Sequence, residues 1–194
     1  MYRRLHSKTV TLAIAVFLFQ LCNPSFAEVK NEHKVKAAIV YKLLRYISWP
    51  EEASQSATIN LCVDQNDPFF TAFSDVDGRK VRNRKIVLKD QPQDVSSEEC
   101  QIVFISADGQ QSIYLAEVKA KMGVLTISDS RQFAERGGMI NLLVKNDRVR
   151  FKINPHAAYQ SRLRINSSLL RMADIVETEN QSAANLHVDS EAFE

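Results

Sequence analysis

Short apolar runs rich in β-branched residues alternate along this chain with segments of helical spacing. The expected strands are residues 59–63, 85–88, 102–105 and 124–127. The expected helices are residues 35–47, 68–78, 112–121, 131–136, 157–163 and 169–175. Two further apolar runs, residues 139–144 and 149–153, are joined by a polar turn and predict a hairpin. The pattern predicts a single-domain α/β sandwich with a mixed, largely parallel sheet, flanked by helices and followed by a C-terminal hairpin.

Local signals predict where two of these helices end or begin. Pro50 pushes the residue before it, Trp49, out of the helical region, so the first helix is expected to end there. Asp129 follows an expected strand, and its carboxylate suits the N-cap of a helix over residues 131–136. Both predictions depend on local preference alone.

The first 27 residues carry the three segments of an export signal. The basic start contains Arg3, Arg4 and Lys8, the apolar run covers residues 9–21, and the cleavage site has the small residues Ser25 and Ala27. A retained membrane anchor is disfavoured because a span takes about 20 apolar residues. Lipidation of Cys22 is a further alternative, although the residues before it are bulky. We expect residues 1–27 to be removed as a cleavable signal peptide.

Loss of this leader changes the charge of the chain. The full chain has 25 basic and 23 acidic residues, but residues 1–27 hold three basic and no acidic ones, so the remaining 167 carry a net charge of −1. No overall positive charge is left to favour nucleic acid. The remaining length suits one domain, which we place at residues 28–176. The polar residues 177–194 are expected to form a disordered tail.

Cys62 and Cys100 are the two cysteines outside the leader. An even count in an exported chain predicts one disulfide. Closing a loop of about 39 residues stabilises a fold by roughly 4 kcal/mol in the chain-entropy model. Two buried free thiols are the alternative, and the spacing matches neither C-x-x-C nor a zinc pattern.

Motifs of catalysis and cofactor binding are missing from the sequence. Its five glycines form neither G-x-G-x-x-G nor a phosphate-binding loop, and no G-x-S-x-G occurs. The histidines outside the leader, His33, His156 and His187, lie in no metal-ligand pattern. We therefore expect no enzyme activity, no cofactor and no metal site.

Several phrases in a fixed order resemble one protein family. Three are specific: Phe-Ala-x-x-Gly-Gly-Met at residues 133–139, Phe-x-Ile-Asn at residues 151–154 and Leu-Leu-x-x-Ala at residues 169–173. The segments that precede them are residues 38–50, 59–63, 67–69, 100–106 and 124–129. Together they resemble the YfiR family of periplasmic proteins, and the resemblance spans nearly all of residues 35–175.

The resemblance implies a role that composition does not. Proteins of the YfiR type are soluble periplasmic repressors of a membrane-bound diguanylate cyclase, whose periplasmic sensor part they bind, so that cyclic di-GMP synthesis and biofilm formation are held down. An outer-membrane lipoprotein with a peptidoglycan-binding domain sequesters the repressor, and family members form dimers. For this chain the resemblance implies the periplasm, an inner-membrane cyclase as partner and a homodimer. Some members carry a second disulfide near the Gly-Gly block, but Ala134 and Asn141 stand in that region here, so that bridge is absent.

Two groups of side chains are candidates for binding. Tyr41, Tyr46 and Trp49 belong to a wide apolar face of the first helix, and we expect a partner or homodimer contact there. Core packing of Trp49 is an equal alternative. Arg164, with Asn166 beside it, is a candidate for binding an anionic ligand, and a solvated arginine is the alternative. A periplasmic small-ligand sensor acting on another envelope signalling protein is therefore the second functional class.

Overall fold

The computed structural model describes residues 26–51, 56–92, 99–107, 121–146 and 148–176. The chain divides into two compact units, residues 1–31 and 32–194, and the sheet belongs to the second. Within the described residues, no helix combines the length and apolar character needed to cross a membrane. Almost all of the expected leader, the tail at residues 177–194 and the helix expected at residues 112–121, except its last residue, lie outside the described residues.

Helices and strands follow one another much as the sequence predicts. The helices are α2 (Phe26–Leu43), the 3-10 helix η2 (Leu44–Tyr46), α4 (Pro68–Phe73), α6 (Pro155–Gln160) and α7 (Ser167–Leu170). The strands are β1 (Ile47–Ser48), β2 (Thr58–Val63), β3 (Lys80–Val81), β4 (Arg84–Asp90), β5 (Ile102–Ile105), β6 (Leu125–Ser128), β7 (Ile140–Lys145), β8 (Arg148–Ile153), β9 (Arg164–Ile165) and β10 (Asp174–Ile175). Asp67 and Asn154 cap α4 and α6 by accepting a backbone N–H, with Pro68 and Pro155 in the first turns.

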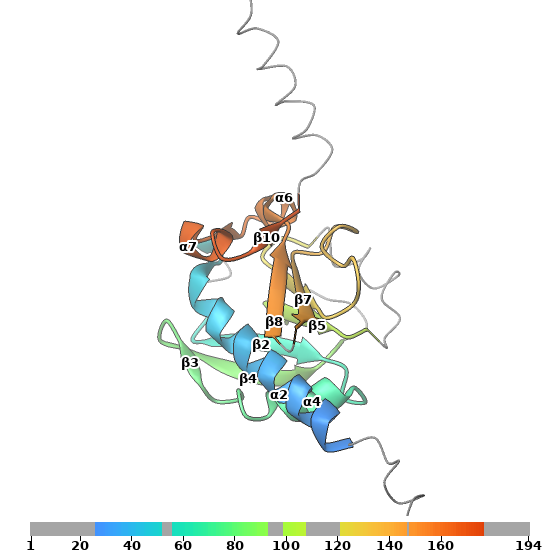
Figure 1. The fold of residues 1–194 in the computed structure, drawn as a ribbon. Helices are drawn as coiled ribbons and strands as arrows, with labels where there is room; N and C mark the ends of the chain where they lie inside the picture. The colour runs from blue at the N-terminus through green and yellow to red at the C-terminus, as the bar shows by residue number, and fades with distance from the viewer. Residues whose placement is uncertain (1–25, 52–55, 93–98, 108–120, 147, 177–194) are drawn as a thin grey trace, which may run out of the picture. The chain divides into compact units, whose positions relative to one another are not determined.

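Eight of the described strands form one mixed sheet in the order β10-β8-β7-β6-β5-β2-β4-β3 (Figure 1). The central strands β4, β2, β5, β6 and β7 are parallel. β8 returns antiparallel to β7, β10 extends the sheet parallel to β8, and β3 lies antiparallel to β4 at the other edge. The predicted fold class and the C-terminal hairpin are confirmed. Chain order reverses between β2 and β5, and open α/β sheets bind ligands beyond the carboxyl ends of strands at such a switch point.

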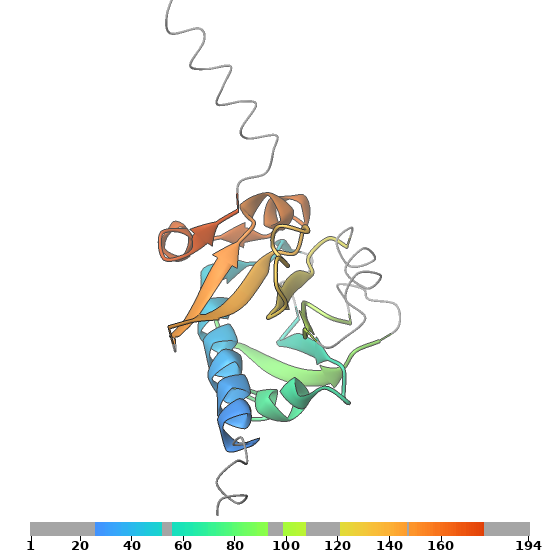
Figure 2. The same ribbon diagram turned by 45° about the vertical axis from the view of Figure 1, so that its right-hand side comes forward.

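The two faces of the sheet bury different side chains, because successive strand residues point to opposite faces. The part of α2 from Glu32 onward runs across one face (Figures 1 and 2), where Val40 and, in η2, Leu44 belong to the same buried cluster as Leu61 and Phe104. The cluster on the other face contains Cys62, Cys100, Val103, Ile105, Val124 and Phe133. Each fully buried large side chain of this kind stabilises the fold by about 1.5–3 kcal/mol. The large cluster therefore fixes α2 to the sheet.

Cys62 and Cys100 form the disulfide that the sequence predicts. Their Cα atoms are 5.8 Å apart, and both side chains are fully buried. The bridge joins β2 to the residues that lead into β5, the two strands on either side of the switch point.

The first helix differs from the prediction at both ends. α2 begins at Phe26, well before the expected residue 35, and the helical run finishes with η2 at Tyr46, one residue before the expected end at residue 47. Ile47 is already extended, with φ −102° and ψ 135°, and it pairs with Ile165 of β9. The long-range pairing with β9, rather than the proline, ends the helix.

Two other predicted helices are wrong in whole or in part. Residues 131–136 form a series of turns, in which Gln132 has a φ of 58° that a right-handed helix excludes. Within residues 169–175 the helix α7 stops at Leu170, and β10 pairs with β8 instead. In both places tertiary contacts outweigh an amphipathic pattern that is only a few residues long.

The structure explains why the phrase Phe-Ala-x-x-Gly-Gly-Met has two glycines, at residues 137 and 138, after Phe133. Gly137 adopts a φ of 97°, a conformation that side chains oppose. The Gly138 N–H donates to the Phe133 carbonyl at 2.9 Å, and a Cβ on Gly138 would overlap the Phe133 ring. Because that ring is fully buried and cannot move aside, glycine is needed at residue 138.

Candidate functional site

The β1–β9 ladder brings the two groups of candidate residues together. Ser48 pairs with Arg164 across the ladder. The backbone N–H of Asn166 donates to the Tyr46 carbonyl at 2.9 Å. The end of the first helical run and the Arg164 segment, which the sequence proposes separately, are therefore neighbours. We call the residues 46–49 and 164–166 the ladder surface.

A cleft of about 270 Å³ lies beside this ladder surface. It is lined by Ile47, Ser48, Trp49, Ile59, Val81, Arg82 and Arg84. Arg82 donates from Nη1 to the Ser48 hydroxyl and from Nη2 to the Arg45 carbonyl, both at 2.9 Å. Arg82 and Asn83 form the β3–β4 turn with φ values of 48° and 67°, which are typical of tight hairpin turns. The turn thus holds the Arg82 guanidinium against the Ser48 hydroxyl.

Arg84 contributes a second guanidinium to the cleft. Its Nε donates to the Ser56 carbonyl at 2.9 Å and its Nη2 to the Thr58 carbonyl at 2.7 Å. Burial lowers the pKa of Arg84, but an arginine side chain remains charged in proteins. The guanidinium lies 6.0 Å from the centre of the Trp49 ring. Sequence analysis missed Arg82 and Arg84, although the Arg-Asn pair between two strands is a turn signal that would have found the first.

The two predicted ligand residues have different surroundings. Arg164 is exposed, and its guanidinium makes no hydrogen bond or ion pair within the part of the chain that the structure describes. Asn166 is the N-cap of α7, where its Oδ1 accepts the Ser168 N–H at 2.8 Å. Asn166 therefore has a structural task, and ligand binding by Arg164 and Asn166 stays a prediction.

Trp49 lies in the core rather than on the surface. Its side chain is 9% exposed, and its Nε1 donates to the Gln101 carbonyl at 3.2 Å. An exposed anchor for a partner at this position is therefore wrong, and the alternative of core packing holds. The cause is β1, which turns the chain toward the sheet directly after the helix and carries the indole inward with it.

Tyr41 and Tyr46 remain candidates for a protein contact. Both are half-buried and pack against the main core cluster. The Tyr41 hydroxyl donates to the Lys80 carbonyl at 3.1 Å, and the Arg79 guanidinium lies 5.5 Å from its ring centre. These contacts fix the ring beside the β3–β4 hairpin, and a partner contact at either tyrosine stays a prediction.

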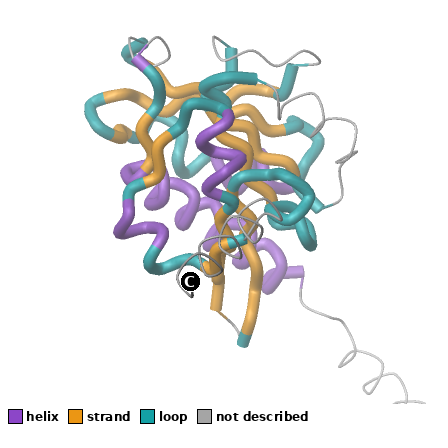
Figure 3. Tube along the Cα trace, turned by 90° about the horizontal axis from the view of Figure 1, so that it is seen from above, coloured by secondary structure: helices purple, strands orange, loops and turns teal. Residues whose placement is uncertain are grey.

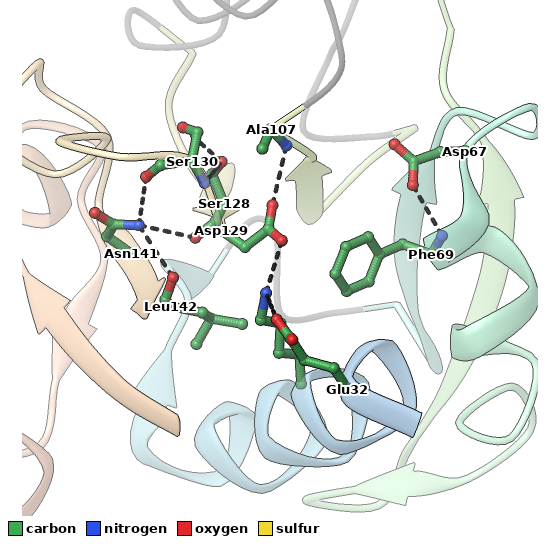
Figure 4. Close-up of polar contacts among 10 residues, drawn as sticks. Glu32, Asp67, Phe69, Ala107, Ser128, Asp129, Ser130, Asn141 and Leu142 are labelled. Atoms are coloured by element: carbon green, nitrogen blue, oxygen red, sulfur yellow. Dashed lines mark hydrogen bonds and ion pairs between the residues drawn. The ribbon is translucent and has the colours of Figure 1, made fainter. Parts of the chain in front are cut away.

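A second group of polar side chains lies at the carboxyl ends of β5 and β6, close to the switch point (Figure 4). The Lys36 ammonium on α2 donates to Asp129 Oδ2 at 2.9 Å and lies 2.6 Å from Glu32 Oε1. The other oxygen, Asp129 Oδ1, accepts the Ala107 N–H at 3.0 Å. Asp129 is therefore not a helix cap. It binds the end of β5 and the helix α2 at once.

The Lys36–Asp129 ion pair is almost completely buried, with side chains 8% and 9% exposed. Burial by itself would lower the pKa of Lys36, but the hydrogen bonds and charges of Glu32 and Asp129 outweigh it and raise the pKa above 10.5. The ammonium also lies 5.8 Å from the Phe69 ring centre, a favourable cation–π distance. The ammonium therefore lies close to the carboxyl end of β6 and to the Phe69 ring of α4.

Asn141 holds the loop that follows β6. Its amide Nδ2 donates to the Ser130 carbonyl at 2.7 Å and to the Ser128 carbonyl at 3.3 Å (Figure 4). All three residues are buried, so these bonds define the loop geometry that places Asp129. Within the described ranges, no group of three or more His, Cys, Asp or Glu could hold a metal ion.

A family model for YfiR/HmsC-like proteins matches residues 33–174, well over half of the chain. The chain belongs to the YfiR/HmsC-like family. The match extends from α2 to β10, so that it contains both the ladder surface and the Lys36–Asp129 pair. The YfiR/HmsC-like family is regulatory rather than catalytic.

One solved structure that resembles this chain is a conserved domain protein from Vibrio cholerae O1 biovar El Tor. The two chains are 12% identical, with a TM-score of 0.44, over 75% of this chain. The chain spans 60% of the length of that protein. No curated protein matches the chain.

Proposed function

We propose that this protein is an exported periplasmic regulator that binds the periplasmic part of a membrane-bound diguanylate cyclase. Binding would repress the cyclase and lower cyclic di-GMP signalling and biofilm formation. The observation that carries the proposal is the YfiR/HmsC-like match over residues 33–174. The buried Cys62–Cys100 bridge supports it, since disulfides persist in oxidising compartments.

The contact region that the proposal favours consists of the ladder surface, the adjoining cleft and the nearby Tyr41. Tyr41 and Tyr46 lie near the cationic cleft formed by Arg82 and Arg84, so that aromatic area and positive charge occur together. Aromatic residues and arginine are the residue types enriched in protein interfaces. A homodimer and an outer-membrane peptidoglycan-binding lipoprotein are further partners within the same proposal.

Deletion of the gene should raise cellular cyclic di-GMP, and a restored exported copy should lower it again. A copy that starts at residue 28 and stays in the cytoplasm should fail to repress, because it and the sensor part of the cyclase face opposite sides of the membrane. The measurement is cyclic di-GMP by mass spectrometry in the wild type, the deletion strain and the strains with the exported and the cytoplasmic copy.

A matched control separates location from folding in this experiment. The copy starting at residue 28 is placed behind a foreign cleavable leader, which restores export and disulfide formation together. Repression should return in that strain. Full repression by the cytoplasmic copy would contradict the proposal.

A second candidate function, sensing of an anionic small molecule, is favoured by the arginines at the ladder. Arg82 and Arg84 line the cleft, and Arg164 lies opposite Ser48. Guanidinium groups suit carboxylate and phosphate because they offer paired donors. A ligand that preferred one state of the regulator would also tune its affinity for the partner.

Inorganic phosphate and citrate serve as probes for this function. Either anion should raise the melting temperature of the wild-type protein by mass action if it binds the native state. Arg164→Gln should lose that increase, whereas Arg162→Gln, an equal change of charge at another exposed arginine nearby, should keep it. An identical response of all three proteins would remove Arg164 from any anion site.

A further inference from the structure

The β7–β8 hairpin ends in a projecting two-stranded ribbon. β7 pairs with β6 only at Ile140 and Asn141, and β8 pairs with β10 only at Lys152 and Ile153. Beyond these residues, within the described part of the chain, the two strands pair only with each other. Figures 2 and 3 show the turn end of the hairpin extending away from the rest of the sheet.

One face of this ribbon is strongly basic. The register places Lys145 opposite Arg148 and Leu143 opposite Arg150, and residues that are directly opposite share a face. Lys145, Arg148 and Arg150 are exposed, and none of them forms a hydrogen bond or an ion pair with the residues that the structure describes. The segment 145–152 contains four basic residues and one acidic residue, whereas residues 28–194 as a whole are close to neutral.

The directly opposed basic pair Lys145 and Arg148 does not stabilise the pairing of the two strands. Like charges directly opposite each other destabilise an antiparallel pair. Farther along the same face, the Lys152 ammonium forms an ion pair with Glu135, with 2.6 Å between Nζ and Oε1. Lys152 therefore differs from Lys145 and Arg148 in having an acidic partner among the described residues. Positive charge on an open ribbon also discourages pairing with other strands. Among the described residues of the ribbon, the basic side chains without a partner are therefore concentrated near its tip.

The opposite face of the tip is apolar and partly open. Val144 lies opposite Val149; the Val144 side chain is 47% exposed, whereas Val149 is half-buried and packs against the main core cluster. Long basic side chains next to exposed apolar groups are typical of elements that settle in the headgroup region of a bilayer, where the apolar stems insert and the charges meet lipid phosphates. A projecting tip suits a deformable lipid surface better than it suits a flat or convex protein.

From these observations we propose that the tip of the β7–β8 hairpin binds the surface of an anionic phospholipid bilayer. The contact groups are Lys145, Arg148 and Arg150, with Val144 entering the interface. This contact goes beyond the proposed repression, because it needs no cyclase. It would hold the protein at the membrane in which a cyclase partner is embedded and would raise its local concentration there.

Co-sedimentation with vesicles tests the proposal without any partner protein. The wild-type protein should sediment with vesicles that contain phosphatidylglycerol, remain in solution with pure phosphatidylcholine, and dissociate at high salt. Lys145→Gln with Arg148→Gln should lower the partition coefficient about 30-fold, since each basic residue near an anionic surface contributes about a fivefold gain. The melting temperature of this variant should stay the same or rise, because a like-charge pair is removed.

A control with the same loss of charge shows whether the site is local. Lys85→Gln with Lys89→Gln changes two exposed lysines on β4 and should bind vesicles as the wild type does. Val144→Ser should weaken binding a few-fold without changing its dependence on salt. Equal binding to neutral vesicles, an unchanged partition coefficient for the hairpin variant, or capture by poly-glutamate but not by vesicles would each overturn the proposal.

Discussion

Lys36→Met should lower the free energy of unfolding by about 3–5 kcal/mol, because it leaves the buried Asp129 carboxylate without its cation. The measurement is guanidinium denaturation of the oxidised protein at neutral pH. Glu32→Gln is the matched control: the Glu32 side chain is 43% exposed, and a pair of that kind contributes at most about 1 kcal/mol. An equal loss in the two variants would mean that the Lys36–Asp129 pair contributes no more to the free energy of unfolding than the Lys36–Glu32 pair does.

A double-mutant cycle separates the pair from its surroundings. Asp129→Asn removes the charge but keeps an acceptor for the Ala107 N–H. The variant that combines Lys36→Met with Asp129→Asn should be more stable than the sum of the two single losses predicts, since no buried charge is left unpaired. Strict additivity would contradict a direct interaction between the two side chains.

The pH dependence of the same pair follows from the pKa of Lys36. Its folded-state pKa lies above the ordinary 10.5, so the contribution of the pair is complete below that pH and is lost as the pH rises through the folded value. The stability difference between wild type and Lys36→Met should therefore be constant around neutral pH and shrink only above pH 10.5.

Trp49→Ala should destabilise the protein by about 3–5 kcal/mol, the usual cost of removing a large aromatic side chain from a core. The indole is nearly buried and donates to the Gln101 carbonyl, so both packing and a hydrogen bond are lost. Thermal unfolding followed by circular dichroism measures the change.

Two variants make the Trp49 result specific. Trp49→Phe keeps most of the packing and should lose less stability than Trp49→Ala. Tyr159→Ala removes an aromatic side chain that is 77% exposed and should leave the melting temperature nearly unchanged. A small loss for Trp49→Ala would return Trp49 to the surface and revive it as an anchor for a partner.

The central strands could be predicted from the sequence because their signal is local. β2, β5 and β6 are buried on both faces, and such strands appear as short continuous apolar runs. The Cys62–Cys100 bridge followed from the number of cysteines, and the hairpin followed from two apolar runs around a polar turn. None of these features depends on distant residues for its pattern.

The strands β1, β9 and β10 could not be predicted, because each has only two residues and exists through its partner. The same reason explains the error at Trp49, whose burial depends on the direction that β1 takes. Asp129 had the local features of a helix cap, but the buried Lys36 and the Ala107 N–H compete for its carboxylate. A signal for Lys36 was present in the sequence: it shares a helix face with Val40 and Leu43, where a lysine needs a partner.

The β1–β9 ladder also has a consequence for the order in which the molecule is completed during synthesis. A ribosome delivers the N-terminal residues first, so β1 exists long before its partner Arg164–Ile165. The Cys62–Cys100 bridge does not involve that partner, since both cysteines precede it in the chain. A chain interrupted before residue 164 would contain the Cys62–Cys100 disulfide and most strands of the sheet but would lack the ladder surface. The ladder surface can therefore form only once the chain extends through residue 166.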